Sequence, residues 1–141
     1  MESLWQVACR LVWSLGEDAA CLDAIAAHVR GMELLVEHLS PAQRAQYDRF
    51  NCFDVVGGNT GRRYRIRHGQ VMNVEVLDDA GYRMCALCFM PKGRLPVGDV
   101  MLAQKLALES FEAEAIKVAQ MSPPSHIRTR GGSPVQWRLR R

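Results

Sequence analysis

Four arginines within six residues make residues 62–67, Arg-Arg-Tyr-Arg-Ile-Arg, the part of the chain best suited to bind anions. Alternate side chains of an extended strand point to opposite faces, so Arg63, Arg65 and Arg67 share one face. The tyrosine and isoleucine between them share the other face, which we expect to pack in the core. The guanidinium groups would then lie about 7 Å apart, close to the spacing of phosphates on a nucleic-acid strand.

Two interpretations of this strand remain open. In the first, its arginines bind the phosphates of a nucleic acid or an acidic protein surface, with Arg62 and the loop of residues 57–61 fixing the register. In the second, the arginines lie on a solvent-exposed strand face and pair with Glu75 and other acids across the sheet. The sequence favours neither decisively.

The C-terminal segment, residues 121–141, is a second basic region, with no acidic residue and with Trp137, which could stack on a base. Its rich content of Pro, Gly, Ser and Arg predicts a flexible tail. Such a tail would add screened, non-specific attraction to polyanions. Its charge comes from Arg128, Arg130, Arg138, Arg140 and Arg141.

The other chemistry-bearing patterns favour neither a catalytic site nor a metal site. Residues 57–61, Gly-Gly-Asn-Thr-Gly, join two expected strands, so they predict a hairpin connection rather than a phosphate loop, which leads into a helix. Cys85 and Cys88 have zinc-knuckle spacing, but no second ligand pair follows them. The four histidines form no recognisable catalytic set. We therefore expect a protein that is not an enzyme and that needs no metal or cofactor.

The elements that must position these residues begin with a helical N-terminal part. Residues 3–15 are apolar apart from a narrow polar stripe, which predicts a helix covered on most sides. Gly16 is expected to end it, and residues 18–38 follow the 3.6-residue period of a second helix, so the two form an antiparallel hairpin. The excess apolar surface predicts self-association or docking to a protein partner. The expected interface residues are Trp5, Leu11, Val12 and Trp13.

A short helix, a sheet and a long helix follow. Ser40, Pro41 and Gln43 match a capped helix start with a proline in its first turn. Strands are expected at residues 53–56, 62–68, 71–77 and 82–90, and a helix at 100–120. We expect Asp99 to cap that helix, and its solvent side to carry Lys105, Glu109 and Glu112.

The predicted fold is therefore α+β, with an antiparallel meander of about four strands covered by the long C-terminal helix. The expected division is a helical part at 1–51, the sheet with its helix at 52–120 and the basic tail at 121–141. A chain of 141 residues that is 48% hydrophobic and 23% charged can bury a core, which excludes a wholly disordered or collagen-like protein.

Charge and cysteine usage bear on partners and location. The formal net charge is +3, but residues 1–39 carry −4 whereas residues 62–94 carry +4. No apolar run reaches the roughly 20 residues of a membrane-spanning helix, so no membrane association is expected. The acidic N-terminus and the odd count of five cysteines favour a cytoplasmic protein with reduced thiols.

The central block resembles a known family. It runs over residues 60–109 and includes T-G-R-R-Y-R-I-R-H-G, L-C-F-M-P-K-G-R-L-P and G-D-V-M-L-A-Q-K-L-A-L-E. This block is similar to a family of small bacterial and phage-associated proteins, a resemblance that implies no activity, cofactor or partner. Its outline is also loosely similar to SWIM-type zinc modules, but their C-x-C and C-x-H pairs are absent here.

The sequence thus predicts a small non-enzymatic binding or adaptor protein whose basic strand and tail engage a polyanion. The polyanion would be a nucleic acid or an acidic surface of a nucleic-acid-handling protein. The alternative is an oligomerising structural, assembly or inhibitor protein that acts through its apolar N-terminal helices.

Overall fold

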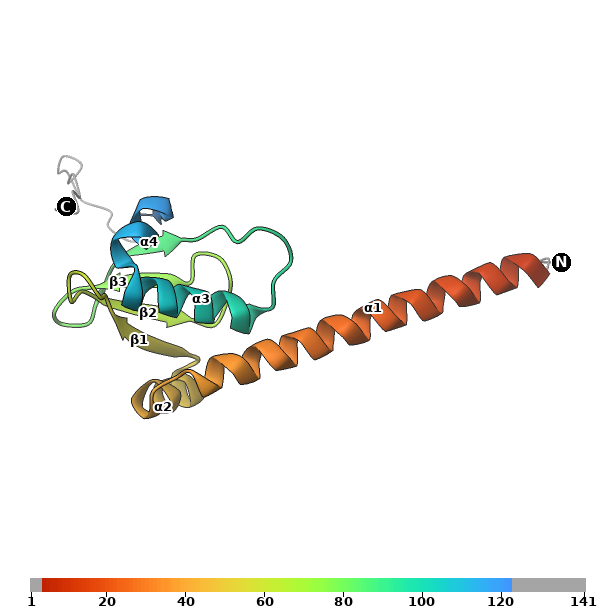
Figure 1. The fold of residues 1–141 in the computed structure, drawn as a ribbon, viewed down its shortest axis with the longest axis horizontal. Helices are drawn as coiled ribbons and strands as arrows, with labels where there is room; N and C mark the ends of the chain where they lie inside the picture. The colour runs from red at the N-terminus through yellow and green to blue at the C-terminus, as the bar shows by residue number, and fades with distance from the viewer. Residues whose placement is uncertain (1–3, 123–141) are drawn as a thin grey trace, which may run out of the picture.

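The computed structural model describes the backbone of residues 4–122 and the side chains of residues 19–122. Within residues 4–122 the chain forms two helices, four strands, two further helices and a last strand, which confirms the α+β class (Figure 1). The N-terminal helices are α1 (Leu4–Glu37) and α2 (Pro41–Phe50). The strands are β1 (Cys52–Val56), β2 (Arg63–Arg67), β3 (Val74–Leu77), β4 (Arg83–Cys88) and β5 (Gln120–Ser122). Between β4 and β5 lie α3 (Val97–Ser110) and α4 (Glu112–Val118).

The predicted helical hairpin is wrong, because α1 is one helix of 34 residues that passes through Gly16 without a break. A glycine inside a helix costs only about 1 kcal/mol relative to alanine, which is too little to end a helix that has good helix formers on both sides. Figure 1 shows α1 running away from the sheet, with its N-terminal end far from the rest of the protein. Of the helices that the structure describes, none combines the length and the apolar run needed to cross a bilayer.

Helix α2 begins as predicted. The Ser40 side chain accepts a hydrogen bond from the backbone N–H of Gln43, whose own side chain accepts one from the Ser40 N–H. The helix ends at Asn51, which adopts a left-handed conformation with φ of 51°. Asparagine tolerates this conformation better than most residues, and the resulting turn leads directly into β1.

The five strands form an antiparallel sheet in the order β1-β2-β3-β4-β5, so the predicted meander is confirmed and gains a fifth strand. Phe53, Tyr64, Ile66 and Val74 point to the same face, where each is almost fully buried. Helices α3 and α4 cover that face and complete the core through Met101, Leu108 and Ala115. The three residues of β5 carry too short a pattern to be predicted from the sequence.

The predicted single helix at 100–120 is wrong in three respects. Helix α3 begins at Val97, so Pro96 occupies the cap position and Asp99 lies in the first turn. Phe111, with φ of −137° and ψ of 41°, separates α3 from α4. Of the side chains expected in solvent, Lys105 and Glu112 are buried. The turn at Phe111 brings the start of α4 to the loop between β1 and β2, which buries Glu112.

The last turns of α1 attach the long helix to the rest of the protein through two glycines. A side chain at Gly98 in α3 would overlap the backbone carbonyl of Gly31 in α1. The two helices therefore approach each other backbone to backbone, and Leu35 of α1 reaches the core beside Met101. This close crossing anchors the C-terminal third of α1, while residues 19–25 are exposed.

Candidate polyanion-binding surface

The face of the sheet opposite α3 and α4 carries four arginines and two acids, and we call it the arginine face. Its members are Arg63, Arg65, Arg67, Arg83, Asp54 and Glu75. Strand register places Asp54, Arg65 and Glu75 in one row across β1, β2 and β3. The predicted alternation of β2 is confirmed, because Tyr64 and Ile66 are buried while the arginines lie on the opposite face.

Asp54 holds two of the arginines. Arg65 donates two hydrogen bonds to its carboxylate, from Nε to Oδ1 at 2.8 Å and from a terminal nitrogen to Oδ2 at 3.1 Å. Arg63 donates a third bond to the same Oδ2 at 3.1 Å. A carboxylate that receives a planar two-point contact fixes the direction of the guanidinium group.

Glu75 binds the other two arginines of this face. Arg67 donates from Nε to Oε1 at 2.9 Å, and Arg83 makes an ion pair with the same oxygen at 3.6 Å. The Glu75 side chain is only 6% exposed, whereas that of Arg67 is 51% exposed. The acid therefore lies beneath the arginines and leaves their outer N–H groups toward solvent.

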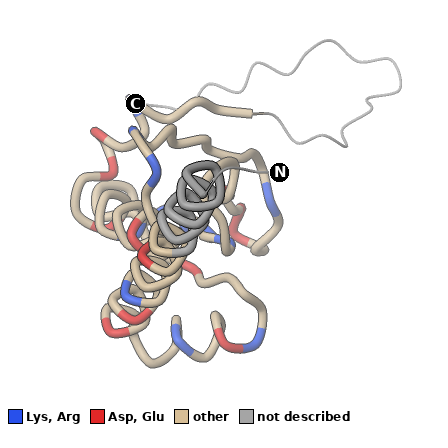
Figure 2. Tube along the Cα trace, turned by 90° about the vertical axis from the view of Figure 1, so that its right-hand side faces the viewer, with Lys and Arg blue, Asp and Glu red and all other residues tan. Residues whose placement is uncertain are grey.

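The pairing with acids that the sequence suggested is present, but it does not neutralise the surface. Four guanidinium groups share two carboxylates, which leaves a surplus of two positive charges on the arginine face. Hydrogen bonds from Arg65 to Asp54 and from Arg67 to Glu75 raise the pKa of both guanidinium groups. Figure 2 marks the acidic and basic positions along the described Cα trace, and both kinds occur on α1 and on α2.

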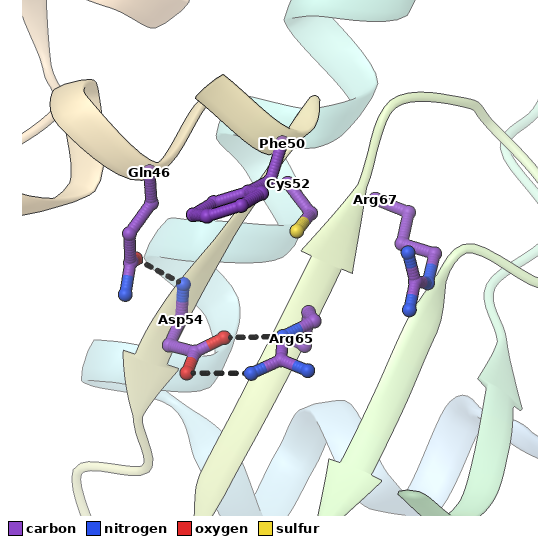
Figure 3. Close-up of a pocket in the computed structure, with 6 residues that line it drawn as sticks. All are labelled: Gln46, Phe50, Cys52, Asp54, Arg65 and Arg67. Carbon is purple, nitrogen blue, oxygen red and sulfur yellow. Dashed lines mark hydrogen bonds and ion pairs between the residues drawn. The ribbon is translucent and has the colours of Figure 1, made fainter. Parts of the chain in front are cut away.

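A pocket of about 400 Å³ opens where α2 meets this face (Figure 3). Asp54, Arg65 and Arg67 come from the sheet, and Cys52 begins β1. Gln46 and Phe50 come from α2, and the Gln46 side chain accepts a hydrogen bond from the Asp54 backbone N–H at 2.9 Å. The left-handed turn at Asn51 is what brings the end of α2 over the sheet.

The pocket combines a charged wall with an aromatic one. Phe50 is 59% exposed, and the Arg49 guanidinium carbon lies 5.1 Å from its ring centroid. Burial raises the pKa of the Cys52 thiol, although the charges of Arg67 and Arg65 oppose that effect. The thiol is therefore protonated at neutral pH, a poor state for a nucleophile or a metal ligand.

The other residues predicted to bind polyanions lie elsewhere. Arg62 precedes β2, and its charge acts on the Tyr64 hydroxyl and the Cys85 thiol, which are groups of the core face. The arginines of the tail lie outside the described residues. The predicted interface residues fall within α1, where the structure gives the backbone but not their side chains. Those residues are Trp5, Leu11, Val12 and Trp13.

The loop of residues 57–61 is a hairpin connection, as predicted, and it encloses an anion that belongs to the protein itself. The carboxylate of Glu112 accepts hydrogen bonds from the backbone N–H groups of Asn59 and Thr60, both at 2.8 Å. It also accepts bonds from the Thr60 hydroxyl at 2.5 Å and the Tyr64 hydroxyl at 2.6 Å. A side chain at Gly57 would overlap this carboxylate, which explains the glycine.

Glu112 is the charged residue whose role the sequence analysis missed. Burial alone would raise the pKa of Glu112, but the hydrogen bonds from Thr60, Tyr64 and Asn59 outweigh it and hold that pKa below its usual value. Because all four donors belong to the protein, this cradle is a structural link between the β1–β2 loop and α4. It therefore offers no free anion site.

Among the described side chains, no three His, Cys, Asp or Glu residues lie close enough together to hold a metal ion. No protein-family model, no curated protein and no solved structure matches this chain. The resemblance of residues 60–109 to small bacterial and phage-associated proteins therefore stays a prediction.

Proposed function

We propose that this chain is a non-enzymatic binding protein whose arginine face binds a polyanion. Single-stranded nucleic acid is the ligand that the pocket fits best. The observation that carries the proposal is the pocket in which Arg65 and Arg67 lie beside the exposed ring of Phe50. Proteins that bind single strands combine a basic groove along the backbone with aromatic rings on which bases stack. An acidic protein surface would use the charges but would gain nothing from the ring.

The ion pairs on the arginine face support binding rather than preclude it. Asp54 and Glu75 fix the guanidinium groups from below, so little side-chain freedom remains to be lost when a phosphate binds. Among the described residues the terminal N–H groups of Arg67 have no hydrogen-bond partner, and these groups can donate two bonds to one phosphate. Positioned donors with surplus charge are what a phosphate contact requires.

The tail could bind nucleic acid independently, so the test must separate it from the sheet. We expect a fluorescent single-stranded DNA of about 12 nucleotides to bind the full chain, with an affinity that falls as salt rises from about 50 to 200 mM. Fluorescence anisotropy across this series gives the salt slope. The comparison is a full-length variant in which the five tail arginines are replaced by glutamine.

The expected result is that the tail variant still binds, more weakly, and retains a measurable salt slope. A variant that no longer binds at low salt would assign the interaction to the tail and would contradict a role for the sheet. A protein that binds duplex DNA as tightly as the single strand would contradict stacking on Phe50, because the faces of bases inside a duplex are already covered by the neighbouring base pairs.

A further inference from the structure

Helix α1 carries an apolar stripe that the described residues leave uncovered. Leu22, Ile25 and Val29 are 66%, 55% and 47% exposed, although they follow one another at spacings of three and four residues on one side of the helix. Met32 continues the same stripe and packs against the core. The stripe therefore begins as part of the core and continues outward along α1, where no other described part of the chain lies beside it (Figure 1).

The same spacing extends over the whole length of α1 as a heptad repeat. Counting in sevens from Leu4 gives Leu11, Asp18, Ile25 and Met32, and counting from Ala8 gives Leu15, Leu22, Val29 and Val36. Nine of these ten positions are apolar. A repeat of 3.5 residues, sustained for more than four heptads, is typical of helices that coil around one another rather than of a helix lying on a globular surface.

The charges of α1 are placed so that two copies can meet without repulsion along most of the seam, which is the line of heptad positions where the two helices would touch. The positions that flank the seam between residues 5 and 28 hold no ionised Lys, Arg, Asp or Glu. Arg10, Glu17, Asp23 and Arg30 fall at positions one step further from the seam. Asp18 is the exception, since it interrupts the seam, and a single polar seam residue commonly fixes register at some cost in stability.

The apolar area that α1 could bury is comparable with that of a standard interface. Residues 4–29 span about 39 Å, and a fully buried large aliphatic side chain removes roughly 60–120 Å² from water. Nine large apolar residues at and beside the seam would together bury roughly 500–1,100 Å² on each helix, against about 800 Å² per partner in a standard interface. These residues are Leu4, Trp5, Val7, Leu11, Val12, Leu15, Leu22, Ile25 and Val29.

We propose that α1 pairs with α1 of a second copy of this chain, and that the seam is the heptad stripe through Leu22, Ile25 and Val29. This inference does not depend on nucleic-acid binding. A pair of chains would present two arginine faces, so that a single strand long enough to reach both would bind more tightly than it binds one face.

The test is the mass of the full-length protein in solution, measured by sedimentation equilibrium over a range of micromolar concentrations. We expect twice the mass of one chain. The variant Leu22→Glu/Ile25→Glu should have the mass of one chain, because it places four carboxylates in the seam of the pair. Both side chains are largely exposed within one chain, so circular dichroism and thermal unfolding of the full-length variant should show that its fold is retained.

The matched control is Ala20→Glu/Ala24→Glu, which adds the same charge to exposed positions away from the seam. It should remain a pair. A wild-type protein that has the mass of one chain throughout the concentration range would overturn the proposal, and so would a pair that survives Leu22→Glu/Ile25→Glu. Equal loss of pairing in the control would also overturn it, since the effect would then come from helix charge and not from the seam.

Discussion

Replacing Glu112 with leucine is expected to lower the free energy of unfolding by about 1–3 kcal/mol. The substitution leaves the backbone N–H groups of Asn59 and Thr60 and the hydroxyls of Thr60 and Tyr64 without the acceptor that they share. The Tyr64 hydroxyl is buried, and a buried donor that loses its partner costs about 1–3 kcal/mol, whereas Asn59 and Thr60 are exposed and can bond to water. Chemical denaturation followed by circular dichroism measures the loss. A change below about 1 kcal/mol would mean that water replaces the carboxylate, contrary to its burial.

The same carboxylate should make stability depend on pH. The pKa of Glu112 is lower in the folded protein than in the unfolded chain, so its contribution is fully present above the ordinary carboxyl pKa of 4.5. As the pH falls below that value, the unfolded chain takes up a proton that the folded protein does not, and stability is lost. The difference between the wild type and Glu112→Gln should therefore shrink below pH 4.5. Glu114→Gln is the control, because Glu114 is exposed in the same helix turn.

Replacing Arg65 and Arg67 with glutamine is expected to weaken binding of single-stranded DNA at low salt by about tenfold or more, which corresponds to about 1.4 kcal/mol. The salt slope should fall by about 1.4, since each phosphate contact to a single strand contributes about 0.7. The fold should survive, because Asp54 keeps Arg63 as a partner and Glu75 keeps Arg83. Fluorescence anisotropy across a salt series measures both changes.

The chain offers a control with the same loss of charge. Lys92 and Arg94 are exposed in the loop between β4 and α3, and neither lines the pocket. The variant Lys92→Gln/Arg94→Gln should retain nearly all the affinity of the wild type. An equal loss of affinity in the two double variants would show that only total charge matters, and the pocket would have no particular role.

Short sequence patterns correctly predicted the elements that depend only on neighbouring residues. The capped start of α2 follows from three residues, and the two faces of β2 follow from alternation along five. Gly16 shows the limit of such signals. A glycine between two apolar stretches is compatible with a break or with a continuous helix, and the local energy difference is about 1 kcal/mol. The heptad spacing that runs through Gly16 contains the longer-range information that favours one helix.

The parts of the surface that the sequence did not predict depend on residues far apart in the chain. Glu112 resembles any acid on a helix until the chain brings it to Thr60 and Tyr64, about 50 positions earlier. One signal could have indicated it, because a core-facing tyrosine needs a partner for its hydroxyl. The pocket depends in the same way on the turn at Asn51, which decides where the ring of Phe50 lies.

The most direct test of the proposed function is to map where a single-stranded DNA of about 12 nucleotides contacts the full-length protein, by following backbone amide chemical shifts in a titration. We predict that the largest changes occur at Phe50 and Cys52 and at Arg65 and Arg67, the residues that line the pocket. Changes confined to residues 123–141 would make the tail the binding element. Either that result or the absence of any change at the pocket residues would contradict the account.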